Sequence, residues 1–165
     1  MRAPGRLRRF GLVNRHVMLA WKASTLLRVA SILTLFYCAG HSAGMPWTPA
    51  EGFGEMAVLE LMKSYHFEIE GFSRSYWDFY VGFGSIISGF LLLQAVVLWQ
   101  LAGLAKTDAL RVRPVVATFA VAFLLNAALA SFYFFVVPLV MAIAITATLG
   151  MAFVAAGRGE MPPSE

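Results

Sequence analysis

This sequence has few charged residues and a single cysteine. Only 13% of its 165 residues are charged and 59% are hydrophobic, whereas soluble domains have roughly 25% charged and 45–50% apolar residues. Cys38 has no partner for an internal disulfide, and no CxxC motif or Cys/His cluster with zinc spacing is present. We therefore expect no metal site and no cofactor, and the excess of apolar residues places the chain in a lipid bilayer.

The apolar residues fall into long segments. A helix needs about 20 apolar residues to cross a membrane, so this length leaves room for four spans and excludes a separate soluble domain. We expect transmembrane spans over 24–43, 77–104, 114–134 and 138–156. A basic cytoplasmic segment, 1–23, precedes the four-helix transmembrane domain, 24–157, and a polar cytoplasmic tail, 158–165, follows it. The turn before Pro138 is very tight, so the third and fourth spans must be neighbours.

The charges are distributed unevenly along the chain. Eleven of the 13 Lys and Arg residues lie in the N-terminal segment through Arg28, in the loop after the second span and in the tail, whereas five of the nine acidic residues lie in the first loop. Cytoplasmic loops of membrane proteins carry an excess of Lys and Arg, so both termini are expected in the cytoplasm. Because topology accounts for the positive charge, no nucleic-acid partner is expected.

The first loop, 44–76, is the only long connection, and it is expected to be external. Thr48-Pro49-Ala50-Glu51 has the spacing of a capping box with proline at the first helical position. Apolar residues then recur at helical intervals from 55 to 66, which predicts an amphipathic helix on the bundle or membrane surface. The predicted fold class is therefore all-α: a four-helix transmembrane bundle with a short amphipathic helix in the external first loop.

A group of polar and charged residues is predicted at the outer end of the spans. Arg74 and Asp78 are four residues apart and can pair on one helix. The outer-face cluster consists of His41, Glu70, Arg74, Asp78 and Tyr80. It is a candidate site, although a purely structural ion pair at the entry of the second span is the favoured explanation of Arg74 and Asp78.

Residues for helix packing are suggested in the second and third spans. Gly82, Ser85 and Gly89 fall on one helical face, and a face of small residues allows a second helix to approach closely. Asn126 lies near the middle of the third span, where an amide side chain more often bonds to a neighbouring helix than to a ligand.

Four parts of the sequence resemble a family of small, uncharacterised bacterial four-span integral membrane proteins. They are Ala39-Gly40-His41, the acidic loop with Met56 and Met62, the block FSRSYWDFYVGFG at 72–84, and the aromatic turn 132–138. The resemblance implies a multi-pass protein of the bacterial inner membrane. It implies no activity.

Two main classes of function are consistent with these observations, and a channel or transporter formed by homo-oligomerisation is a third alternative. The first is a non-catalytic scaffold that binds membrane lipid, a partner subunit or a second copy of itself. It is favoured because the spans contain few ionisable groups. The alternative is a small membrane-embedded enzyme or redox accessory that acts on a quinone-type or isoprenoid-type substrate at the outer-face cluster. That alternative requires His41 and Arg74 to approach each other.

Overall fold

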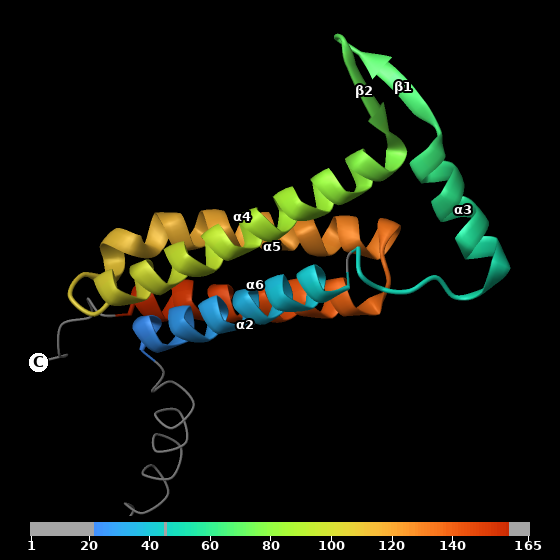
Figure 1. Ribbon diagram of the computed structural model, residues 1–165. Coiled ribbons are helices and arrows are strands. Elements are labelled where there is room, and N and C mark those ends of the chain that lie inside the picture. The colour runs from blue at the N-terminus through green and yellow to red at the C-terminus, as the bar shows by residue number, and fades with distance from the viewer. Residues whose placement is uncertain (1–21, 45, 159–165) are drawn as a thin grey trace, which may run out of the picture. The chain divides into compact units, whose positions relative to one another are not determined.

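The computed structural model describes residues 22–44 and 46–158. The expected basic segment therefore lies outside the described residues except for its last two positions, and the polar tail lies outside them except for Arg158. The elements in chain order are α2 (Ala23–Ala43), α3 (Gly52–Ser64), β1 (His66–Ile69), β2 (Phe72–Ser75), α4 (Tyr76–Leu104), α5 (Ala109–Tyr133) and α6 (Val136–Ala156) (Figure 1). Among the described residues, four helices are long and apolar enough to cross a membrane: α2, α4, α5 and α6. The predicted all-α class, with four long helices and a short helix in the first loop, is confirmed.

The described chain divides into two compact units. The helical unit contains residues 22–31 and 97–158, and the hairpin unit contains 32–44 and 46–96. Helices α2 and α4 each contribute a part to both units.

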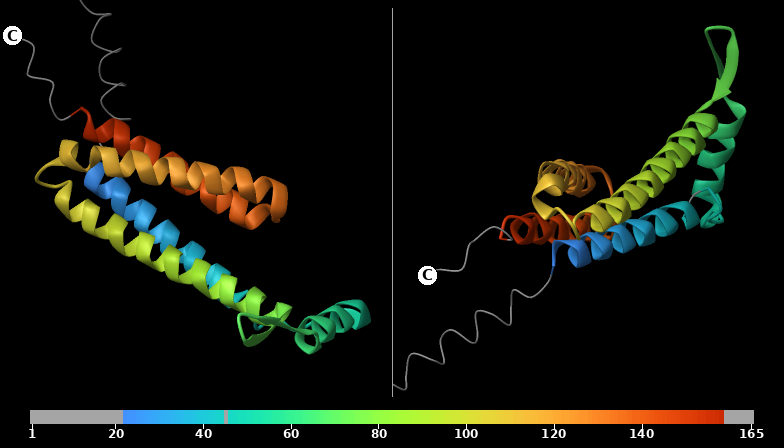
Figure 2. Two further views of the ribbon diagram at one scale, coloured as in Figure 1. Left: turned by 90° about the horizontal axis from the view of Figure 1, so that it is seen from above. Right: turned by 90° about the vertical axis from the view of Figure 1, so that its left-hand side faces the viewer.

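The core of the helical unit is built where parts of four helices bury small and branched side chains. Its fully buried residues include Leu27 of α2, Leu98 of α4, Phe123 of α5 and Leu149 of α6. Figure 2 shows α5 and α6 side by side, and only Phe134 and Phe135 separate them in sequence. The expected neighbours in the third and fourth spans are therefore confirmed.

The third span starts earlier than expected. Asp108 is the N-cap of α5, and its carboxylate accepts a hydrogen bond of 3.0 Å from the backbone N–H of Arg111. This cap fixes the first turn at Ala109, so Pro114 lies inside the helix rather than at its beginning. A proline has no N–H to donate to the preceding turn, so α5 loses one backbone hydrogen bond there.

A two-stranded hairpin that the sequence analysis missed lies between α3 and α4. Strands β1 and β2 are antiparallel, with His66 opposite Ser75 and Ile69 opposite Phe72. Glu70 and Gly71 form the two-residue connection, with φ angles of 52° and 83°. Positive φ at both positions is the geometry of a type I′ turn, which matches the twist of the two strands.

The first-loop helix exists, but it is not capped as expected. Thr48 donates its hydroxyl to the carbonyl of Gly44 at 2.9 Å, and Glu51 is the N-cap of α3 without a capping bond from its side chain. Instead, the N–H of Glu51 donates to the carboxylate of Glu55. The helix ends at Ser64 rather than at 66, because the chain enters β1 there.

Candidate functional site

The junction between β2 and α4 is held by a serine and an aspartate. The carboxylate of Asp78 accepts hydrogen bonds from the backbone N–H of Ser75 at 2.8 Å and from its hydroxyl at 2.9 Å. The backbone N–H of Asp78 donates to the same hydroxyl at 3.2 Å. This reciprocal arrangement is a capping box, and it starts α4 at Tyr76. The motif Ser75-x-x-Asp78 is visible in the sequence, but the spacing of Arg74 and Asp78 suggested an ion pair for Asp78 instead.

Arg74 lies on β2, so the prediction that Arg74 and Asp78 lie one turn apart on the same helix is wrong, although the charge of Arg74 still acts on the Asp78 carboxylate. The guanidinium of Arg74 donates to the carbonyl of Ser73 at 2.7 Å and lies 5.3 Å from the ring centre of Phe72. The helical spacing of four does not apply, because the chain becomes helical only after Ser75. Asp78 is occupied by its capping bonds instead.

The remaining members of the outer-face cluster lie in different places. Glu70 is exposed in the hairpin turn, and Tyr80 lies on α4 with its ring 5.4 Å from that of Trp77. His41 is half-buried in the last turn of α2. The structure therefore does not gather these residues into a single site.

His41 belongs to a different group, which we call the polar cluster. Its members are Cys38, His41, Ser42 and Ser88. The thiol of Cys38 donates to the backbone carbonyl of Ser88 at 3.3 Å, and Nδ1 of His41 lies 3.1 Å from Oγ of Ser88. The hydroxyl of Ser42 lies 2.9 Å from Oγ of Ser88 and 2.8 Å from the carbonyl of Cys38. The polar cluster therefore links α2 to α4 within the hairpin unit.

His41 and Asp78 lie at different levels of α4. His41 contacts Ser88, which follows Asp78 by ten residues, or about 15 Å along the helix. Asp78 and Arg74 line one groove together with Phe79. An enzyme site that needs His41 and Arg74 together is therefore not formed.

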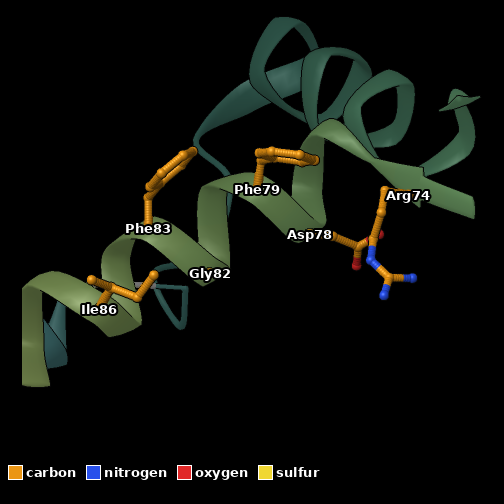
Figure 3. Close-up of a pocket in the computed structure, with 6 residues that line it drawn as sticks. All are labelled: Arg74, Asp78, Phe79, Gly82, Phe83 and Ile86. Atoms are coloured by element: carbon orange, nitrogen blue, oxygen red, sulfur yellow. The ribbon is translucent and has the colours of Figure 1, made fainter. Parts of the chain in front are cut away.

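That groove runs along one side of α4 and has a volume of about 280 Å³. It is lined by Arg74, Asp78, Phe79, Gly82, Phe83 and Ile86. Figure 3 shows Arg74 and Asp78 at the start of α4, with Phe79, Phe83 and Ile86 following along the helix. Apart from its charged end, the groove is an apolar surface of a single helix.

A second cavity, of about 380 Å³, lies beneath α3. The connection 44–50, helix α3 and the first turns of α4 line it, with Trp77 and Tyr80 as its aromatic wall. The ammonium of Lys63 lies 4.7 Å from the ring centre of Trp77, which is a cation–π contact between α3 and α4.

Helix α3 turns a mixed charged and apolar side toward this cavity. Glu55, Glu60 and Lys63 line it, and so do Met56 and Leu59. The outward face of α3 consists of Phe53, Ala57, Val58 and Leu61. Phe53 is 90% exposed, Leu61 67% and Val58 57%, and α3 has no buried residue. Apolar residues therefore lie on two sides of α3: Met56 and Leu59, from the face predicted to rest on the bundle or membrane, line the cavity, and the outward face is a second apolar side that the sequence did not predict.

Gly82, Ser85 and Gly89, which were expected to form a close helix contact, do not form one among the described residues. A Cβ atom added at Gly82 or Gly89 would meet no described atom within 4 Å. Ser85 is exposed and donates its hydroxyl to the carbonyl of Val81 on its own helix. The side of α4 that contacts α2 carries Ser88 instead, and Gly84, one turn earlier, is buried. Asn126 is half-buried on α5, and its role in packing stays a prediction.

These features define the class of protein. Helices long and apolar enough to cross a membrane make up most of the described chain, so this is a multi-pass helical membrane protein. Comparison with known protein families, with curated proteins and with solved structures found no match for the chain. The resemblance to the bacterial four-span proteins therefore stays a prediction.

Proposed function

We propose that this is a non-catalytic protein of the bacterial inner membrane, with both termini cytoplasmic, that works by binding lipid or a partner subunit at its hairpin unit. The observation that carries this proposal is the outward face of α3 (Phe53, Ala57, Val58 and Leu61). Full burial of a side chain such as Phe, Val or Leu contributes roughly 1.5–3 kcal/mol. Leaving three such residues exposed to water would lose several kcal/mol of the free energy that their burial provides. We therefore infer that another surface covers this face.

The membrane interface is the surface that fits this face best. Helix α3 runs across the direction of α2 and α4 (Figure 1), so it lies along the membrane plane when those helices cross the bilayer. Aromatic residues surround it, as at many membrane interfaces: the rings of Tyr65 and Tyr76 are stacked 6.0 Å apart, and Phe67 lies 5.2 Å from Tyr76. A polar face rich in lysine is typical of interfacial helices. Here the two glutamates, Glu55 and Glu60, face the cavity rather than the lipid.

A test compares two neighbouring positions of α3. In a background with Cys38→Ala, a cysteine at Leu61 or at Glu60 is labelled with an environment-sensitive fluorophore, and the protein is reconstituted in lipid nanodiscs. We expect quenching by spin-labelled lipid at Leu61 but not at Glu60, which lines the cavity. Protection of Leu61 from both lipid and aqueous quenchers would instead identify a bound protein partner. Free access of an aqueous quencher to Leu61 would refute the proposal.

One observation favours a second candidate function, a membrane-embedded enzyme. The hydroxyl of Ser88 lies 3.1 Å from Nδ1 of His41, which is the geometry of a nucleophile beside a base. A fluorophosphonate probe that labels the parent but not Ser88→Ala would support this candidate. Absence of labelling in the reconstituted parent, under conditions where a known serine hydrolase reacts, would count against it.

A further inference from the structure

A cavity lined by two lysines lies in the helical unit, where α2 begins, α4 ends and α6 ends (Figure 1). We call it the lysine cavity. Its volume is about 470 Å³, within the range of roughly 300–1,000 Å³ typical of small-molecule sites. Its lining consists of Lys22, Ala23, Ser24, Ala105, Lys106, Ala109 and Ala155. Four alanines leave the space open, and the described lining contains no carboxylate.

The polar groups around the lysine cavity are suited to an anion. Lys22 and Lys106 supply two ammonium groups from separate parts of the chain. The first turn of α2 is also present: its backbone bonds start with Thr25 and Leu26 donating to the carbonyl of Lys22. The N–H groups before them have no acceptor within the helix, and helix N-termini favour negative charge.

A serine adds a hydrogen-bond donor to the two lysines. Ser24 is only 8% exposed and lines the lysine cavity. A serine hydroxyl can donate a hydrogen bond to a phosphate oxygen. The nearest carboxylate in the sequence, Asp108, already accepts from the N–H of Arg111 as the cap of α5.

We propose that the lysine cavity binds the phosphate of an anionic phospholipid. The cavity lies at the ends of helices that are long enough to cross the membrane, which is the level of the lipid headgroups. Basic pockets between transmembrane helices bind such headgroups. The phosphate is held between the ammonium groups of Lys22 and Lys106 and accepts from the hydroxyl of Ser24, while the alanines contact the glycerol backbone. This proposal rests on other residues than the binding surface of α3, so the two can fail separately.

The test is native mass spectrometry of the full-length protein in mild detergent. The protein is titrated with phosphatidylglycerol and with phosphatidylcholine of the same acyl chains, and separately with millimolar inorganic phosphate. We expect the parent to prefer phosphatidylglycerol. The double variant Lys22→Gln with Lys106→Gln should bind it about 30-fold more weakly, since each lysine near an anionic lipid contributes roughly a fivefold factor.

Two further variants make the result decisive. Lys63→Gln with Arg74→Gln removes the same charge from the hairpin unit, and it should leave the affinity unchanged. Ala155→Leu narrows the lysine cavity and keeps both lysines, so it should also weaken binding, and it replaces the lysine variant if that variant does not fold. Equal affinity of the parent and the lysine variant, or no preference of the parent for phosphatidylglycerol, would overturn the proposal. Lysine-dependent binding of inorganic phosphate without lipid binding would show that the site takes a soluble anion, and would overturn the lipid as its ligand.

Discussion

The polar cluster (Cys38, His41, Ser42 and Ser88) predicts a specific effect of removing one hydroxyl. In Ser88→Ala, Nδ1 of His41 and the hydroxyl of Ser42 lose their contacts at 3.1 Å and 2.9 Å. The thiol of Cys38 keeps its acceptor, because that acceptor is the backbone carbonyl of residue 88. Ser42 also keeps the carbonyl of Cys38. The variant therefore removes the side-chain contacts of one residue and leaves the backbone contact between α2 and α4.

The expected loss of stability in Ser88→Ala follows from the number of polar groups that lose a hydrogen-bond partner. A hydroxyl proton can serve only one acceptor at a time, so the hydroxyls of Ser42 and Ser88 supply at most two hydrogen bonds among these atoms. Interhelical hydrogen bonds in membranes contribute about 0.6–2 kcal/mol, and a half-buried imidazole nitrogen left alone adds to the loss. We expect Ser88→Ala to destabilise the protein by about 1–2 kcal/mol. For a chain of this length this corresponds to a decrease in Tm of roughly 2–8 °C.

The assay is thermal unfolding in detergent, followed by near-UV circular dichroism, and Ser85→Ala is the matched control. Ser85 lies on the same helix, is exposed, and bonds only to the carbonyl of Val81 one turn earlier. Its removal should change stability by less than about 0.5 kcal/mol. If both variants had the same Tm, the polar cluster would contribute nothing to the contact of α2 with α4. A cycle with His41→Leu should further show that the double variant loses less than the sum of the single losses.

Three other outcomes are expected. Cysteines introduced beside Glu68 and beside Thr107, in a background with Cys38→Ala, should be labelled from outside only at the first position, and the reverse pattern would invert the topology. Gly89→Leu should change Tm by less than about 2 °C, because a Cβ there meets no described atom within 4 Å, so a large loss would indicate a close contact that this chain does not show. Phe153→Leu should destabilise by about 1–2 kcal/mol, measured by thermal unfolding, because the Arg113 guanidinium lies 4.0 Å from that ring, and a neutral result would mean that the contact is not stabilising.

The spans could be predicted from the sequence because length and apolarity alone define them. The first and second spans start within one residue of the expected positions, at Ala23 and Tyr76. The start of the third was wrong because proline was treated as a first helical residue, whereas the carboxylate of Asp108, six residues before Pro114, supplies a stronger start signal. Local capping chemistry thus decided the helix boundary.

The hairpin and the site geometry were harder to predict. Four-residue strands carry little periodicity, and the Glu70-Gly71 turn between them was not recognised. Arg74 was consequently assigned to a helix. The contact of His41 with Ser88 joins residues 47 apart in sequence. It depends on the register of two helices, which spacing within one helix does not define. Small residues also occur on two sides of α4. Spacing alone therefore could not show that the side with Ser88, rather than the side with Gly89, contacts α2.

The chain from α3 to α4 contains only very short connections. Tyr65 alone separates α3 from β1, two residues join the strands, and Ser75 leads directly into α4. The segment therefore acts as a rigid connection rather than as a flexible linker. The hairpin turn fixes β1 against β2, and the capping bonds of Asp78 fix β2 against α4. A force applied to α3 is therefore delivered to the first turn of α4 as a rotation or a pull, instead of being absorbed by an intervening loop. Binding of a surface to α3 can therefore shift or rotate the first turn of α4.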